Sequence, residues 1–262
     1  EKALRRADVM CVWGGGAAVK RCKELARVGV SVLEFGPKTS LALIGKESAT
    51  SKKVAIDLAH DASIYNQEAC FSPQIAFVEG DHEAFVQNLV EAFTTYQRLL
   101  PKGHTSIDDH AHVWRARLEA RYGGGRVLQS DGTEWTVIVL SDPSEIHEHP
   151  LSRCMYVVPV VALENALSYV TPDTQTVVLS PWSRQADLRE QLTLRGAAKI
   201  TEIGLAEWQR IGAPHDLIFP LHGLVRWVSV ERGLEYTGKF IQEGPIDTTK
   251  YLMMQTDQLE QI

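Results

Sequence analysis

Apolar and polar positions along the chain form blocks that predict strands and helices in turn. An apolar run at 8–13 predicts a buried strand, and it stops at a triple-glycine turn. The stretch 17–27 then places its apolar residues at helical spacing, and residues 30–35 form a second apolar run. This strand–helix–strand order predicts two parallel strands joined by a right-handed crossover.

The same alternation continues through most of the chain. It predicts further strands at 41–44, 74–78, 154–161, 176–179, 198–203 and 224–231. It predicts helices at 51–65, 82–100, 105–121, 164–170 and 184–195. A hairpin with arms at 126–129 and 134–140 interrupts the series. We therefore predict an α/β fold with a parallel-rich sheet, flanking helices and one antiparallel excursion.

Composition narrows the function classes without naming one. The 262 residues are 44% apolar and 23% charged, with a formal net charge of −6. These values are typical of a globular protein, and the negative charge disfavours nucleic acid as a partner. No apolar run approaches the length of a membrane span. We expect a cytoplasmic protein with reduced thiols, because its four cysteines lie far apart and include no C-x-x-C pair.

Cys70 is the leading candidate for chemistry. It lies in the segment Gln67-Glu68-Ala69-Cys70-Phe71-Ser72-Pro73-Gln74, between a predicted helix and a predicted strand. A thiol in such a loop can be reached by substrate, and nearby backbone N–H groups can lower its pKa and stabilise an oxyanion. The alternative is a buried cysteine that only fills space, which is the common role of a free cysteine.

Two further segments carry candidate residues. Glu34 ends a predicted strand just before Gly36-Pro37, the usual place for a site residue in a parallel sheet, although it can equally point into water. The turn Trp13-Gly14-Gly15-Gly16 feeds a helix start, where backbone N–H groups can approach a phosphate. It matches neither the dinucleotide fingerprint nor the Walker loop, so by itself it indicates only a tight turn.

Histidines and acidic residues in two short segments have the chemical types of metal ligands. Asp108, Asp109, His110 and His112 form one group, and His147, Glu148 and His149 the other. Their two-residue spacing aligns side chains only on a strand, whereas 108–112 begins a predicted helix. A solvated helix start is the better interpretation, and we predict no metal site.

Taken in order, the glycine turn, the Glu34 segment and the Cys70 loop resemble the aldehyde dehydrogenase superfamily. The likeness is greatest to its LuxC-type acyl-CoA reductases, also called long-chain fatty-acyl-CoA reductases. The residues that carry the likeness are Phe35-Gly36-Pro37-Lys38-Thr39-Ser40-Leu41, Ala59-His60-Asp61, the Cys70 segment, and Leu224-Val225-Arg226-Trp227-Val228. It runs over most of the chain and is strongest from about residue 8 to 80.

The resemblance implies a role for each matching residue. Cys70 corresponds to the nucleophile that forms an acyl thioester, and Glu34 to the superfamily's general base. Residues 13–16 correspond to the turn that lies along the dinucleotide, with Phe35 and Gly36 beside it. The implied domains are the end of a dinucleotide-binding domain at 1–35, a catalytic domain at 36–238 and a tail at 239–262. The first half of the superfamily fold is expected to be absent from this chain.

Two departures from the superfamily pattern affect the cofactor site. Glycines replace the hydroxyl residue of the turn, so phosphate contacts must come from the backbone. The Glu-Ile-Phe-Gly-Pro segment, whose glutamate holds the nicotinamide ribose in many relatives, is missing. Its place is expected at 151–156, which reads Leu-Ser-Arg-Cys-Met-Tyr. The ribose contacts of this chain therefore cannot be carried over from the family.

The function implied by this resemblance is NADPH-dependent reduction of an acyl-CoA or acyl-protein thioester to an aldehyde, through an acyl group on Cys70. Implied partners are acyl-transferring proteins and further copies of the chain. Two alternatives remain open. One is an ordinary aldehyde dehydrogenase in which Glu34 activates water, and the other is a subunit that carries acyl groups on Cys70 without reducing them.

Overall fold

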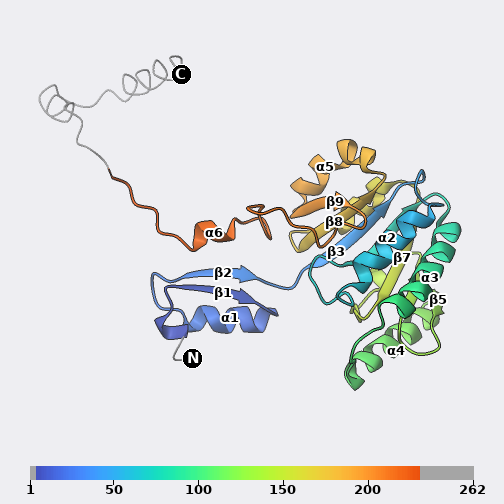
Figure 1. The fold of residues 1–262 in the computed structure, drawn as a ribbon, viewed down its shortest axis with the longest axis horizontal. Helices are drawn as coiled ribbons and strands as arrows, with labels where there is room; N and C mark the ends of the chain where they lie inside the picture. The colour runs from blue at the N-terminus through green and yellow to red at the C-terminus, as the bar shows by residue number, and fades with distance from the viewer. Residues whose placement is uncertain (1–3, 231–262) are drawn as a thin grey trace, which may run out of the picture. The chain divides into compact units, whose positions relative to one another are not determined.

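The computed structural model describes residues 4–230. The first two strands of this part of the chain form a small parallel sheet (Figure 1). Strand β1 (Val9–Trp13) pairs with β2 (Ser31–Phe35), and helix α1 (Gly16–Leu25) connects them. Buried Met10 and Val12 alternate with exposed neighbours along β1 and pack against α1. Burial that alternates every second residue is typical of a strand. Together with the parallel pairing of β1 and β2, it confirms the predicted strand–helix–strand unit.

A seven-stranded sheet forms the rest of the fold, in the order β5-β6-β7-β4-β3-β8-β9. Its strands are β3 (Thr39–Ile44), β4 (Pro73–Glu79), β5 (Arg126–Gln129), β6 (Thr136–Val139), β7 (Cys154–Val160), β8 (Thr174–Ser180) and β9 (Lys199–Glu202). All neighbours pair in parallel except β5 and β6, which form the predicted hairpin. The α/β class with a parallel-rich sheet is confirmed.

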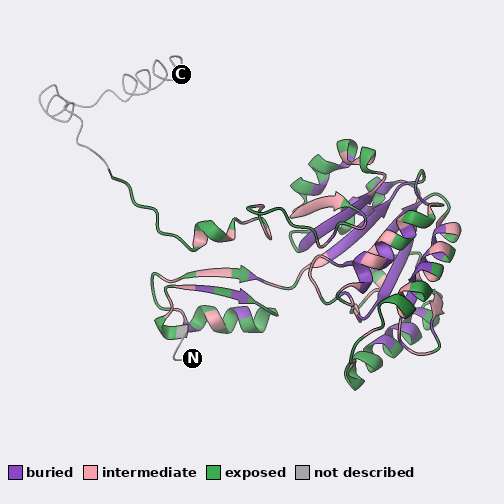
Figure 2. Cartoon of the chain, viewed as in Figure 1, coloured by how far each residue is buried: buried purple, intermediate pink, exposed green. Residues whose placement is uncertain are grey.

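Helices cover both faces of this sheet. Helices α2 (Lys52–Ser63) and α3 (His82–Leu99) pack on one face, against Ala42 and Ile44. Helix α5 (Gln185–Leu194) and the 3₁₀ helix η3 (Leu163–Tyr169) contact Leu41 and Leu43 on the other face. Since both faces of β3 are covered, its residues 41–44 are all apolar, and all are buried (Figure 2).

Shorter elements and one long helix complete the described chain. They are α4 (Ile107–Tyr122), α6 (Pro220–Gly223), and the 3₁₀ turns η1 (Leu4–Arg6), η2 (Pro143–Glu145) and η4 (Trp182–Arg184). No helix among the described residues is long and apolar enough to cross a membrane. Residues up to Leu224 form one compact unit, and residues from Val225 form another, described only as far as residue 230.

Three predicted elements differ from the structure. Residues 164–170 lie in a 3₁₀ helix instead of an α-helix. The second hairpin arm begins at Thr136 instead of residue 134, because Trp135 N–H donates to Ser130 Oγ (3.3 Å) and extends the turn. The late strand predicted at 224–231 is wrong for 224–230, since these residues remain exposed and pair with no strand of the described chain; residue 231 lies outside it.

Helix α4 offers a direct test of how the sequence sets a helix boundary. Ser106 Oγ accepts the Asp109 N–H (3.1 Å), and Asp109 Oδ2 accepts the Ser106 N–H (2.8 Å), which is a complete capping box. We expect Ser106→Ala to lower the free energy of unfolding by about 1 kcal/mol. Urea denaturation measures this change, and Ser183→Ala, at an exposed position, is the control. Equal effects of the two substitutions would contradict a capping role.

Candidate functional site

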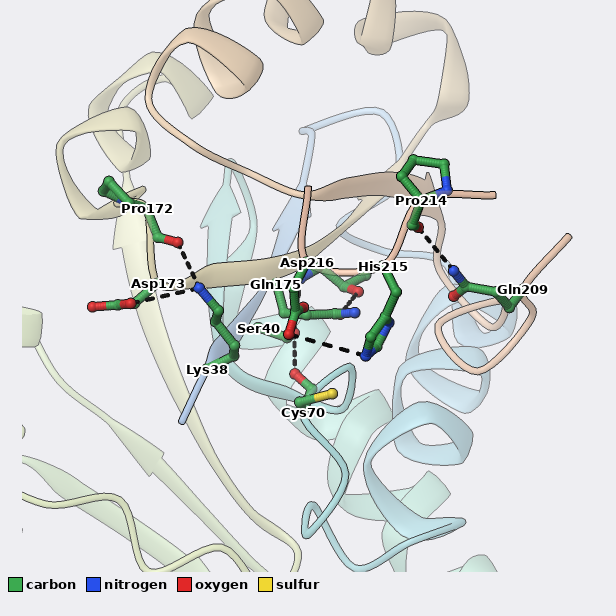
Figure 3. A network of polar contacts seen from close by, with 11 residues as sticks. Lys38, Ser40, Cys70, Pro172, Asp173, Gln175, Gln209, Pro214, His215 and Asp216 are labelled. Carbon is green, nitrogen blue, oxygen red and sulfur yellow. Dashed lines mark hydrogen bonds and ion pairs between the residues drawn. The ribbon is translucent and has the colours of Figure 1, made fainter. Parts of the chain in front are cut away.

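Cys70 lies in the loop between α2 and β4, and buried partners fix its backbone. Ser40 Oγ donates a hydrogen bond to the Cys70 carbonyl (2.6 Å) and accepts one from Thr176 N–H (3.0 Å). Ser40 is fully buried at the start of β3, whereas the Cys70 side chain is only half-buried (Figure 3). The thiol is therefore presented from a rigid edge of the sheet.

This edge is the amino-terminal one. Strands β3, β4 and β8 all begin beside the Cys70 loop, whereas α/β sheets usually place their sites at the carboxyl ends of strands. Glu34 does lie near a carboxyl end, that of β2. Only residues 36–38 separate the end of β2 from the start of β3. Glu34 and Ser40 are six positions apart, so their Cα atoms lie at most about 21 Å from each other.

Gln67 anchors the loop that leads to Cys70. Its side chain is 1% exposed and donates to the carbonyls of Pro73 (2.8 Å) and Cys154 (3.0 Å). The Gln67 side-chain oxygen accepts the Cys154 N–H (2.7 Å). Asn66 and Gln67 both have left-handed backbones, with φ of 49° and 64°. These bonds hold a conformation that non-glycine residues rarely adopt.

Arg153, just before β7, holds the same loop from the start of a neighbouring parallel strand. Its guanidinium donates to Asn66 Oδ1 (2.7 Å) and to the carbonyls of Leu100 (2.8 Å) and Ser63 (3.3 Å). Arg153 is 2% exposed, and it belongs to the left-handed run Leu151–Arg153. Arg153 is the one charged residue of segment 151–156, which is expected in place of the family's ribose-holding glutamate. Its side chain is thus directed into the protein.

His149 fastens this second loop to β4. The Leu151 N–H donates to His149 Nδ1 (2.9 Å), so His149 Nε2 carries the proton and donates to the Gln74 carbonyl (3.2 Å). Burial lowers the pKa of His149 to about 4. The neutral ring is therefore the form that the fold requires at neutral pH.

The electrostatic setting of the Cys70 thiol differs from the prediction. Burial raises its pKa above the ordinary value, and the negative charge of Asp216 raises it further. The N–H groups of Cys70 and Phe71 and the ammonium of Lys199 lower it, as predicted for the loop, but they do not offset the first two effects. Burial and Asp216 together therefore favour the protonated form of the Cys70 thiol.

The glycine turn, Glu34 and Gly36 come together at an open cavity of about 520 Å³. Gly16, Glu34 and Gly36 line it, with Val19, Lys20, Lys23 and Glu24 of α1. Glu34 Oε1 lies 2.8 Å from Lys23 Nζ, and both side chains are substantially exposed. Cys70 does not line this cavity. The structure thus groups two of the predicted cofactor residues, Gly16 and Gly36, with Glu34, and places the predicted nucleophile on a separate loop.

Two aromatic side chains close one end of the glycine turn. The Trp13 and Phe35 rings stack with centroids 4.3 Å apart and planes 10° from parallel. Gly14 N–H donates to the Phe35 carbonyl (3.2 Å), which holds the turn against the end of β2. Phe35 is 2% exposed, whereas Trp13 is 64% exposed. Trp13 consequently offers one open face beside the turn.

The glycine turn, the Glu34 segment and the Cys70 loop therefore follow one another on an α/β scaffold, as in the resemblance drawn from sequence. The family model of the acyl-CoA reductases (LuxC) matches residues 1–227. The chain belongs to the LuxC acyl-CoA reductase family. The match covers the described residues almost completely, so the family assignment includes every residue of the candidate site.

Curated relatives of this LuxC family chain are named long-chain acyl-protein thioester reductases. The protein of Vibrio harveyi is 35% identical over 254 residues, which are 96% of this chain and 53% of the relative. The protein of Aliivibrio fischeri is 35% identical over 96% of this chain and 52% of its own length. The chain thus spans about half the length of the curated relatives it matches.

Solved structures show the same fold at low sequence identity. The aldehyde dehydrogenase KauB from Pseudomonas aeruginosa superimposes with a TM-score of 0.64 and 18% identity, over 82% of this chain and 48% of that one. The NADP-dependent glyceraldehyde-3-phosphate dehydrogenase from Bacillus halodurans C-125, complexed with NADP, gives 0.61 and 17% over 76% and 45%. The predicted aldehyde-dehydrogenase-like fold is confirmed.

Several residues of the candidate site were not predicted from sequence. Gln67 was visible as part of the Cys70 segment, but its anchoring role depends on a strand that starts 87 residues later. His215 and Asp216 lie between the predicted strands at 198–203 and 224–231 and carry no pattern of their own. Among residues 4–230, no three His, Cys, Asp or Glu side chains gather as a metal site, and 108–109 begin the capped helix α4.

The depressed pKa of His149 predicts a defined acid sensitivity. Between pH 6.5 and about 4 the unfolded chain binds a proton at this ring that the folded chain rejects, so stability falls as the pH falls through this window. We expect the loss to reach about 3 kcal/mol. Asparagine retains an acceptor for Leu151 N–H and does not titrate, so His149→Asn should be less acid-sensitive.

Urea denaturation between pH 4 and pH 7 measures this effect. His104→Asn, at an exposed position, is the matched control and should keep the acid sensitivity of the unmodified protein. Parallel stability curves for His149→Asn and the unmodified protein would contradict the role assigned to His149.

Proposed function

We propose that this chain carries the nucleophile of an NADPH-dependent reductase, which converts a fatty acyl thioester into an aldehyde through an acyl group on Cys70. The observation that carries the proposal is the placement of Cys70. Its backbone is fixed by buried Ser40 while its thiol stays half-exposed, and three residues connect the edge it occupies with the strand that bears Glu34. Membership of the acyl-CoA reductase family supports the same assignment.

The substrate class follows from the relatives. The curated proteins from Vibrio harveyi and Aliivibrio fischeri are named for reduction of long-chain acyl-protein thioesters. We therefore assign a long-chain acyl group carried on a thiol, either of coenzyme A or of a protein. A protein donor implies an acyl-transferring partner. Assembly of the chain with further copies of itself stays a prediction.

The residues around the glycine turn fit a nicotinamide dinucleotide. Gly15 caps α1 without a side-chain hydrogen bond, so N–H groups of the first helical turn are open to a phosphate. A Cβ atom at Gly15 or Gly16 would meet nothing within 4 Å, which leaves room for a ligand against the backbone. Lys20 and Lys23 line the same cavity together with Glu24 and Glu34, and Lys23 pairs with Glu34. The resemblance to the family favours NADPH over NADH.

The reaction would proceed in two stages at Cys70. The thiolate attacks the acyl carbonyl and displaces the carrier thiol, an exchange between two thioesters that is nearly neutral in energy. The bound nicotinamide supplies the hydride that reduces the thioester carbon. The N–H groups of Cys70 and Phe71, which already interact with the sulfur, are placed to stabilise the resulting oxyanion, at about 3–4 kcal/mol for one good donor.

Glu34 has no water to activate in this direction. Its carboxylate is engaged by Lys23 at 2.8 Å, and it lines the cavity proposed for the cofactor. Water must instead be kept from the acyl group, because hydrolysis would release a fatty acid. Two rival functions remain. One is aldehyde oxidation that depends on Glu34, and the other is an acyl-carrying role without reduction. The following experiment separates both from thioester reduction.

The proposed nucleophile can be tested by mass spectrometry of the intact protein after exposure to myristoyl-CoA. We expect one acyl adduct, mapped to Cys70 by peptide analysis and absent from Cys70→Ala. Cys22→Ala, which removes a half-buried cysteine outside the loop, should retain the adduct. When the full-length protein is used, addition of NADPH should release the acyl group from Cys70 as an aldehyde.

Each other outcome has a definite meaning. An adduct that persists in Cys70→Ala would overturn the assignment of the nucleophile. An adduct that NADPH never discharges would favour an acyl-carrying role. Aldehyde oxidation that disappears in Glu34→Gln, without any thioester reduction, would favour an ordinary dehydrogenase.

The open face of Trp13 predicts a contribution to cofactor binding. Loss of one aromatic stacking contact weakens binding by about 1 kcal/mol, so Trp13→Ala should raise the dissociation constant for NADPH about fivefold. Fluorescence titration with NADPH, and in parallel with NADH, measures the constant. Trp208→Ala removes a similarly exposed indole outside the cavity and should leave it unchanged. The same loss in both variants would argue against a platform at Trp13.

A further inference from the structure

A strained turn presents two titratable side chains near Cys70. His215 N–H donates to the Ile218 carbonyl (2.8 Å), and Ile218 N–H donates back to the His215 carbonyl (3.0 Å). The two central residues, Asp216 and Leu217, have φ of 48° and 68°. This is the backbone of a type I′ turn, which strongly favours glycine or asparagine over leucine. Strained backbone of this kind concentrates at functional sites.

The Asp216 carboxylate is buried with half of its hydrogen-bonding capacity unused. The side chain is 5% exposed, and its Oδ1 has no hydrogen-bond partner among residues 4–230. The other oxygen, Oδ2, lies 4.0 Å from His215 Nε2. Burial of a carboxylate without full pairing is unfavourable, so an unpaired oxygen in a native fold requires a reason.

The turn faces the proposed nucleophile. Figure 3 shows His215 and Asp216 on the same side of the network as Cys70 and Ser40, and the charge of Asp216 acts on the Cys70 thiol. The His215 ring also contacts Phe35, with centroids 5.2 Å apart. The His215 ring thus contacts the strand end that bears the predicted cofactor residues, while its neighbour Asp216 acts on Cys70.

We propose that the His215–Asp216 pair carries the thiol proton of Cys70 during acyl transfer. This inference rests on the proposed function and adds the group that makes the thiol reactive. His215 accepts the proton as the sulfur–carbon bond forms, and the imidazolium is stabilised by Asp216. As the bond between the acyl carbon and the carrier sulfur breaks, the carrier thiolate takes that proton from His215. Atoms and charge balance without any further reactant.

The pair accounts for a contradiction at the site. A nucleophilic cysteine must ionise, yet burial and a neighbouring carboxylate favour the protonated thiol. Lys199 is the other charged group that acts on Cys70, and its ammonium is held by the carbonyls of Ala206 (2.8 Å) and Trp208. A base that takes the proton only when an acyl carbonyl is present resolves the conflict, and Asp216 then serves as the positioning residue for His215.

Two rates measured on the same variants distinguish this role from simpler ones. One is alkylation of Cys70 by iodoacetamide at pH 7, which follows the thiolate fraction. The other is single-turnover acylation of Cys70 by myristoyl-CoA, followed by mass spectrometry of the intact protein. In Asp216→Asn the loss of the negative charge should raise alkylation about threefold, while acylation falls at least about tenfold.

His215→Gln should reduce acylation about a hundredfold and change alkylation less than about twofold. Asp173→Asn removes a carboxylate from the same network, where it pairs with Lys38 at 3.6 Å, and should leave both rates unchanged. Circular dichroism melts confirm that each variant folds, and the His215 variant keeps the test decisive if the Asp216 variant does not fold.

Opposite changes of the two rates in Asp216→Asn support the pair. If both rates rise, Asp216 only suppresses ionisation, and if both fall, its role is structural; either result overturns the inference. Unchanged acylation in His215→Gln overturns it as well. Acylation of the unmodified protein is measured before any variant is compared. If the unmodified protein never acquires an adduct on Cys70, the proposed function itself is contradicted.

Discussion

One buried hydroxyl fixes the backbone of the loop that carries the proposed nucleophile. Ser40 bonds at once to the carbonyl of Cys70 and to the amide of Thr176, so it joins the loop to the starts of β3 and β8. Ser40 is fully buried, and its bond from the Thr176 amide is shielded from water, whereas its bond to the Cys70 carbonyl is partly buried. The fixed carbonyl orients the remaining peptide units of the loop, and the thiol follows. The position of the thiol in the proposed reaction therefore depends on Ser40.

Around Ser40, buried polar side chains rather than hydrophobic contacts fix the conformation of the loops. Two left-handed loops face each other, one at Asn66 and Gln67 and one at Leu151–Arg153. Gln67 and Arg153 bond to carbonyls that flank these segments, those of Pro73, Cys154 and Ser63. Arg153 is buried among neutral oxygens, an arrangement that lowers the pKa of its guanidinium through desolvation. Such a network specifies one geometry for the loop, because each partner removed leaves a buried group unpaired.

Much of this architecture is present in local sequence pattern. The apolar run of β3 and the glycine turn before α1 each reflect contacts within a few residues or one alternating period, which is why they were predicted correctly. The resemblance of the three segments indicated the fold. The network around Cys70 was different, because Gln67 meets Cys154 and Ser40 meets Thr176 across long stretches of chain. No local pattern encodes such pairs, and the raised pKa of Cys70 depends on Asp216, which is equally remote.

A thiol that stays protonated until its partner arrives has a further consequence for the protein at rest. Peroxide attacks the thiolate, and the first product, a sulfenic acid, is followed by states that no longer return to cysteine. Burial and Asp216 both favour the protonated thiol of Cys70, the form that such oxidants attack least. In the proposed reaction, an arrangement that keeps the thiol protonated until an acyl group is bound would therefore also protect the resting sulfur from oxidation.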